Sequence, residues 1–147
     1  MPMIPEAQKK NFDPMRYILK KAHEVGLEVH AWFCIALLPN ERYSPLLKKN
    51  PNFGAHAPGN EDWQYFKRTN LVIANIHNNA FQDFIINMMM ELIMKYDVDG
   101  LQYDYIRAVK TSYDETSEKE FQEKFGNRLV NATTAELHNW HSEALEN

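Results

Sequence analysis

The sequence predicts an α/β protein, in which helices alternate with the strands of a parallel sheet. Two stretches carry this prediction, residues 13–33 and residues 79–106. In each of them, apolar residues recur at helical spacing, a glycine follows, and a run rich in strand-forming residues comes next. Because 147 residues suffice for one domain with a core of its own, we expect residues 1–147 to form a single domain.

The first stretch opens at Asp13-Pro14, where aspartate suits the N-cap and proline suits the first helical position. The helix is expected to end at Gly26, because glycine readily adopts the left-handed conformation that closes a helix. A strand over residues 27–33 follows directly. The helix has apolar residues at Met15, Ile18, Leu19, Ala22 and Val25, and the strand places Leu27, Val29, Ala31 and Phe33 on one face and Glu28, His30 and Trp32 on the other.

Residues 34–78 form a long connection before the second stretch. Four prolines, at positions 39, 45, 51 and 58, interrupt any regular pattern. Within the connection we expect a short helix near residues 62–66 and a short strand over residues 71–74. Long connections inside compact domains tend to carry function, so this segment is a candidate for ligand contacts.

The second stretch predicts a helix over residues 79–96 and a strand over residues 101–106. The helix should bury one stripe, formed by Phe81, Phe84, Ile85, Met88, Leu92, Ile93 and Tyr96. On the strand, Gln102 and Asp104 share a face, while Leu101, Tyr103 and Tyr105 share the other. Two later pairs, Ser117 with Glu120 and Thr133 with Glu136, have the spacing of a capping box and predict two further helices.

Composition excludes several classes of function. The net charge is −4 and no basic stripe is present, which argues against nucleic acid as the main partner. No apolar run is long enough for a membrane span, and residues 1–10 lack the apolar core of a secretory signal. The six histidines show no metal-binding spacing, and the five glycines form no nucleotide-binding motif, so we expect neither a metal nor a cofactor.

Asp104 is the candidate for chemistry, because barrel enzymes place their catalytic groups on the inward face near the ends of strands. Gln102 lies two residues earlier on the same face, and Arg107 follows within reach of the carboxylate. The arginine would favour the ionised form of Asp104. The alternative is that Asp104 only caps the loop that follows it, and the pattern alone weighs the two equally.

His30 and Trp32 occupy the corresponding face of the earlier strand. If the two strands are neighbours in one parallel sheet, these side chains converge with Gln102 and Asp104. An indole beside a carboxylate suits a sugar ring, because the indole offers a face for stacking and the carboxylate accepts hydrogen bonds from hydroxyl groups. The plainer interpretation of His30 is a structural histidine that supports the strand.

Two segments resemble a known family. The run Phe12-Asp13-Pro14, continued by residues 22–33, resembles a signature of the glycosyl-hydrolase-10-like family of bacterial barrel proteins. Residues 96–107 resemble its second signature, and the resemblance covers roughly residues 12–145 in the same order. It implies a TIM-type barrel that acts on polysaccharide or cell-wall glycan in secreted or envelope-associated proteins. It also implies that Asp104 is the nucleophile, or the carboxylate that stabilises the transition state, with Arg107 supporting it and His30 and Trp32 lining the sugar site.

A complete barrel needs about 250 residues, so the resemblance makes this chain a partial barrel domain with about strands three and four and their helices. Glycoside hydrolysis uses two carboxylates, and the second is expected on a later strand. The main hypothesis is therefore a glycosidase fragment that is inactive in isolation. The alternative is a non-catalytic carbohydrate-binding or assembly module, which could self-associate through open sheet edges.

Overall fold

The computed structural model describes residues 12–43, 45–59, 62–67 and 69–146. The chain divides into two compact units, each of which combines segments distant in sequence. The first unit holds residues 12–33 and 87–102, and the second holds the described residues of 34–86 and 103–146. The prediction of one domain over residues 1–147 includes residues 1–11, which lie outside the described part of the chain.

In the first unit, helix α2 (Pro14–His23) begins as predicted. The side chain of Asp13 accepts a hydrogen bond from the Arg16 N–H, and Gly26 has a φ of +76° in the turn that follows the helix. The buried stripe is narrower than the prediction, because Leu19 is the buried residue of α2 while Ile18 and Val25 are exposed. The helix therefore keeps much of its apolar face at the surface of this unit.

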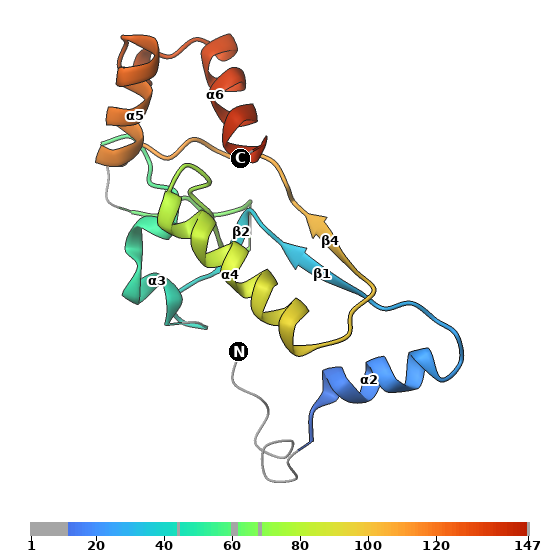
Figure 1. Ribbon diagram of the computed structural model, residues 1–147. Coiled ribbons are helices and arrows are strands. Elements are labelled where there is room, and N and C mark those ends of the chain that lie inside the picture. Colours follow the sequence, from blue (N-terminus) through green and yellow to red (C-terminus); the bar gives the residue numbers. More distant parts are fainter. Residues whose placement is uncertain (1–11, 44, 60–61, 68, 147) are drawn as a thin grey trace. The chain divides into compact units, whose positions relative to one another are not determined.

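The central pairing is between β1 (His30–Cys34) and β4 (Gly100–Asp104). The Asp99 N–H donates to the Val29 carbonyl near the start of the strands, and the Ile35 N–H donates to the Asp104 carbonyl at their end. This order shows that the strands run parallel, and Figure 1 draws both arrows in the same direction. The strands begin within three residues of the predicted boundaries, and each crosses from the first unit into the second.

Close packing explains the glycine in the second signature. A Cβ atom on Gly100 would lie 2.6 Å from Nδ1 of His30, much closer than a real side chain can approach. Beside it, the Asp99 carboxylate accepts hydrogen bonds from the Val29 N–H and from His23. These two bonds lower the pKa of Asp99, the Val29 bond contributing most. The Asp-Gly pair therefore fixes the start of β4 against β1.

The second unit contains a small antiparallel sheet of β2 (Leu37–Pro39) and β3 (Leu71–Ile73). The predicted strand near residues 71–74 is confirmed by β3, whereas β2, helix α3 (Leu46–Lys49) and the 3-10 turn η1 (Pro51–Phe53) were not predicted. The predicted helix near residues 62–66 is wrong. Trp63 and Tyr65 form isolated antiparallel bridges, so this segment extends the sheet as strand-like backbone.

Helices complete the second unit. They are the first half of α4 (Asn79–Lys95), then α5 (Glu115–Phe125), the 3-10 turn η2 (Leu129–Asn131) and α6 (Thr134–Glu146). Phe121, Leu129 and Trp140 form a buried cluster between α5, η2 and α6. Figure 1 shows α5 and α6 side by side. The Thr133–Glu136 capping box is confirmed, because each backbone N–H donates to the other residue's side chain.

The Ser117–Glu120 box is wrong, and the reason is a better acceptor three residues earlier. α5 begins at Glu115 with Asp114 as its N-cap, and the Asp114 carboxylate accepts from the N–H groups of both Thr116 and Ser117. Ser117 lies inside the first turn and is buried. Because Asp114 already accepts from two backbone N–H groups, the helix begins directly after it and Ser117 is not needed as the cap.

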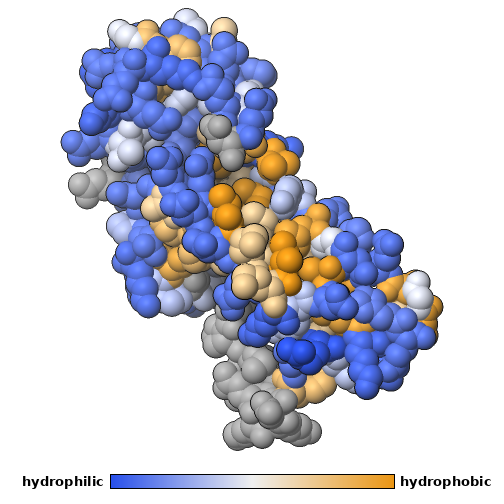
Figure 2. Space-filling view, viewed as in Figure 1, coloured by the Kyte–Doolittle hydropathy of each residue, from blue (hydrophilic) through white to orange (hydrophobic). Residues whose placement is uncertain are grey.

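The long helix α4 buries less than its apolar pattern predicts. Phe81 and Ile85 are buried, and Phe84 and Leu92 are partly buried, whereas Ile93 and Met88 are exposed. Figure 2 shows apolar side chains at the surface along this helix. In its second half the exposed apolar residues are Met88, Met90, Ile93 and Met94. In a closed barrel such positions pack against neighbouring elements.

Candidate functional site

Asp104 is the last residue of β4 and its side chain is partly buried. Directly after it, Tyr105 has a φ of +53°, so the chain turns sharply as the strand ends. Burial raises the pKa of the Cys34 thiol, and the negative charge of Asp104 raises it further. The carboxylate therefore lies near the end of β1 as well, at the carboxyl ends of two parallel strands.

Arg107 lies close to Asp104 in sequence but contacts a different group. Its guanidinium carbon lies 4.5 Å from the centroid of the Tyr105 ring. Among the residues that the structure describes, Asp104 and Arg107 form no ion pair. Arg107 is exposed, so its cation stacks on the tyrosine and remains accessible from solvent.

The other three predicted residues lie on the paired strands within the first unit. His30, Trp32 and Gln102 are all exposed, and 71% of the surface of Trp32 is accessible. The Nε2 atom of His30 lies 3.2 Å from the Glu28 carboxylate, so these two exposed side chains are within hydrogen-bonding distance. The Trp32 indole is accessible for stacking against a ligand.

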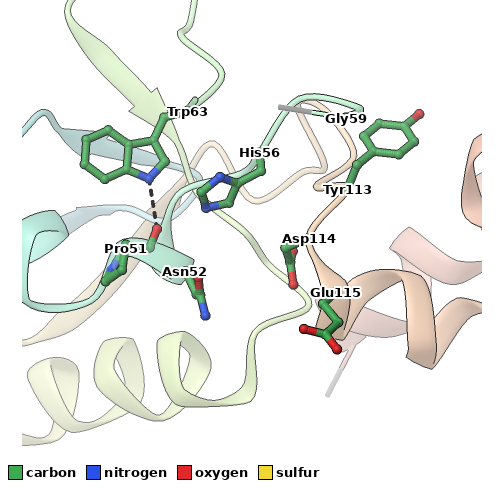
Figure 3. A pocket seen from close by; sticks show the side chains of 8 residues that line it. All are labelled: Pro51, Asn52, His56, Gly59, Trp63, Tyr113, Asp114 and Glu115. Carbon is green, nitrogen blue, oxygen red and sulfur yellow. Dashed lines mark hydrogen bonds between the residues drawn. The ribbon is translucent and has the colours of Figure 1, made fainter. Parts of the chain in front are cut away.

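The second unit contains a pocket of about 490 Å³ that the sequence did not reveal. Figure 3 shows it between Trp63 and His56 on one side and the loop that leads into α5 on the other. Its lining residues are Pro51, Asn52, His56, Gly59, Trp63, Tyr113, Asp114 and Glu115. Because residues 51–63 precede α4 and residues 113–115 follow β4, the pocket is built from the connections that follow β1 and β4.

Trp63 is held in this pocket by two features. Its Nε1–H donates to the Pro51 carbonyl at 2.9 Å, the dashed line in Figure 3. Gly54 lies directly behind the ring, and a Cβ atom there would be 2.7 Å from the indole Cδ1 and 2.9 Å from Val72. The indole therefore has a fixed orientation before any ligand binds.

Replacing this glycine should displace the indole. We expect Gly54→Ala to shift the tryptophan fluorescence spectrum and to broaden the Trp63 indole N–H resonance, because the added methyl group and the ring cannot share the space. The backbone of Gly54, with φ of −87° and ψ of 144°, suits alanine, so the effect arises from contact and not from backbone strain. An unchanged indole resonance would show that the ring does not depend on Gly54.

Asp114 lines the same pocket, but its hydrogen bonds mark it as structural. One oxygen accepts from Ser112, Ser117 and Asn75 side chains at 2.6, 2.7 and 2.8 Å, and the other caps α5. Burial alone would raise the pKa of Asp114, but the bonds from Ser112 and Ser117 hold that pKa below its ordinary value. A carboxylate with this many donors stays ionised and is a poor proton donor or nucleophile.

A pair of histidines, one buried and one partly buried, lies elsewhere in the second unit. Nε2 of His77 lies 2.9 Å from Nδ1 of His141, and Nε2 of His141 lies 3.0 Å from the Thr111 hydroxyl. The His77 ring stacks on Trp140 with centroids 3.5 Å apart. Burial first, and then the charge of His141, lowers the pKa of His77 to about 3, so both imidazoles are neutral near pH 7.

His138 and His141 lie three positions apart on α6. The structure leaves His138 exposed but places His141 in this partly buried pair, a contact over 64 residues that no local spacing reveals. Within the described ranges, no group of three or more His, Cys, Asp or Glu side chains is arranged to hold a metal ion. In the same residues, every helix is too short or too polar to cross a membrane.

Comparison with known proteins gives consistent relatives. A family model described as glycosyl hydrolase-like 10 matches residues 3–147. Glycosyl hydrolase DigH of Escherichia coli K12 is 23% identical over 124 residues, which cover 81% of this chain and 28% of that protein, and DigH of Shigella flexneri matches equally. The chain thus spans just over a quarter of these relatives' length.

A solved structure is similar as well. The crystal structure of a noncanonic maltogenic α-amylase, AmyB from Thermotoga neapolitana, matches 80% of this chain and 26% of its own chain. The TM-score is 0.53 and the sequence identity is 19%, so the likeness concerns the fold. It confirms the predicted fold class, an α/β fragment of a TIM barrel.

Proposed function

Because the chain belongs to the glycosyl hydrolase-like 10 family, we propose that the whole protein hydrolyses glycosidic bonds with Asp104 at its chemical centre. The observation that carries this proposal is the position of Asp104 at the carboxyl ends of two parallel strands, β1 and β4. Barrel enzymes place their catalytic groups at this end of the sheet. The connections that follow the two strands provide a pocket in the second unit, which supports ligand binding on that side.

The proposed role of Asp104 is that of nucleophile or of the carboxylate that stabilises the oxocarbenium-like transition state. Its accessible surface lets a sugar ring approach, and Cys34 beside it remains a neutral thiol because its pKa is raised. Trp32 provides a face for stacking, and His30 and Gln102 can exchange hydrogen bonds with hydroxyl groups. Arg107, stacked on Tyr105, adds positive charge next to the carboxylate in sequence.

Two carboxylates flank the bond in most glycosidases, roughly 5 to 9 Å apart. We place the second one in a part of the protein outside these 147 residues. The carboxylate of Asp114, which lines the pocket, does not suit this role, since its hydrogen bonds keep it ionised. The substrate would be a polysaccharide or a bacterial cell-wall glycan.

The purified 147-residue chain should accordingly bind oligosaccharides without cleaving them. Incubation with a panel of β- and α-linked oligosaccharides, followed by chromatography, should show no products, and Trp32→Ala should abolish binding in a titration. Turnover by the isolated chain that disappears in Asp104→Asn would contradict the proposal that the second carboxylate lies outside these 147 residues. Binding that is lost in Trp32→Ala, together with a whole protein that never cleaves glycans, would favour the non-catalytic binding module instead.

A further inference from the structure

A second cavity of about 600 Å³ lies beside the first in the second unit. The described residues that line it are Glu41, Asp62, Trp63 and Tyr65, all between β2 and β3 in sequence. Trp63 lines both cavities. We refer to this second cavity as the acidic pocket.

The acidic pocket contains a carboxylate, that of Glu41, with an oxygen that needs a hydrogen-bond donor. The Oε2 atom of Glu41 is buried and has no hydrogen-bond partner among the residues that the structure describes, while the residue as a whole is partly exposed. The Arg42 guanidinium, which is next in sequence, lies 5.8 Å from the Tyr43 ring, and the Lys67 ammonium lies 5.2 Å from the Phe66 ring. A buried carboxylate oxygen without a donor is costly, so a ligand that supplies a charged donor gains free energy here.

The rest of the lining agrees with a cationic ligand. Burial raises the pKa of the Tyr65 hydroxyl, and the charges of Glu41 and Asp62 raise it further, so Tyr65 stays neutral. No Lys or Arg is among the described lining residues. Trp63 and Tyr65 add aromatic rings, whose faces attract cations. The acidic side chains and the ring surfaces thus favour an organic cation whose carrier can stack on an aromatic ring.

We propose that the acidic pocket binds the free primary ammonium group of an amino sugar, with Glu41 as its carboxylate partner and Trp63 packing against the sugar ring. The choice of a sugar as carrier rests on the proposed function. An N-acetylated sugar lacks the charge, and an acidic sugar would be repelled by Glu41 and Asp62. The pocket therefore selects glycans that carry unacetylated amino groups.

The test compares two ligands that differ only in acetylation. A tetramer of β-1,4-linked glucosamine should bind the purified chain at least tenfold more tightly than the N-acetylated tetramer in isothermal titration at pH 6. Glu41→Gln keeps the shape of the side chain and should remove that preference. The control, Glu123→Gln, changes an exposed carboxylate of α5 that pairs with Lys119, and it should leave the preference intact.

Equal affinity for both tetramers, or a preference that survives in Glu41→Gln with an unchanged circular dichroism spectrum, would overturn the proposal. Binding of calcium ions that depends on Glu41, without binding of the amino tetramer, would also overturn it in favour of a metal site. The result is separable from the proposed function, because the preference for the amino tetramer is measured as binding and depends on Glu41, whereas the proposed function is measured as cleavage by the whole protein. If glucosamine monomer binds through Glu41 while the whole protein cleaves no glycan, the proposal for the acidic pocket stands and the proposed hydrolase activity is wrong.

Discussion

Lowering the pH from 7 to 4 should reduce the free energy of unfolding by about 3 kcal/mol through His77 alone. The pKa of this imidazole is about 3 in the folded chain and near the ordinary histidine value of 6.5 in the unfolded chain. Below pH 6.5 His77 therefore binds a proton in the unfolded state but not in the folded state. Stability is fully present above pH 6.5 and is lost as the pH falls toward 3.

The geometry gives the reason for the low pKa. His77 lies between the Trp140 face and the His141 ring, where its Nε2 shares one hydrogen with Nδ1 of His141. A further proton on the pair would set two N–H donors against each other in a site with little access to water. Protonation would therefore break the contact between α6 and the segment before α4.

Urea denaturation followed by circular dichroism from pH 7 to pH 4 measures this effect. His77→Phe keeps a ring against Trp140 but removes the titrating nitrogen, so its stability should depend less on pH in this window. The control, His30→Gln, removes an exposed imidazole of β1 and should retain the full pH dependence. A pH dependence that is the same in His77→Phe as in the unmodified chain would contradict the assignment.

Asp114→Ala should destabilise the second unit by at least about 3 kcal/mol. The substitution removes the N-cap of α5 and leaves the hydroxyls of Ser112 and Ser117 and the amide of Asn75 without their acceptor. Ser112, Ser117 and Asn75 are all buried, so water does not replace the lost carboxylate. The loss of a cap alone costs about 1 kcal/mol, and the stranded donors account for the remainder.

The matched control is Asp83→Ala, which removes an exposed carboxylate from α4 and should change stability by no more than about 0.5 kcal/mol. Both variants are compared by urea denaturation at pH 7. A loss for Asp114→Ala as small as that of the control would show that the hydrogen bonds around Asp114 do not support the fold.

The elements that local rules determine were predictable. Asp13 and Thr133 cap their helices as their spacing indicates, and the runs before Cys34 and Asp104 form parallel strands. These features depend on residues within one turn or one strand, where propensity and hydrogen bonding decide the outcome. The position of Asp104 at the strand end followed from the same pattern.

The sequence could not reveal contacts between distant segments. The orientation of Trp63 depends on the Pro51 carbonyl and on the space above Gly54, and His77 meets His141 across 64 residues. The apolar patterns of α2 and α4 predicted more burial than either helix shows. Hydrophobic spacing identifies the apolar face of a helix, but it does not identify the element that packs against that face.

The most direct test of the proposed function is the activity of the whole protein with Asp104→Asn, measured as kcat/KM on an oligosaccharide that the unmodified protein cleaves. The control is Asp97→Asn, which changes an exposed carboxylate seven positions earlier in the chain. A fall of about a thousandfold or more for Asp104→Asn, with little change for the control, is the expected result. Equal activity in both variants would contradict Asp104 as the chemical centre.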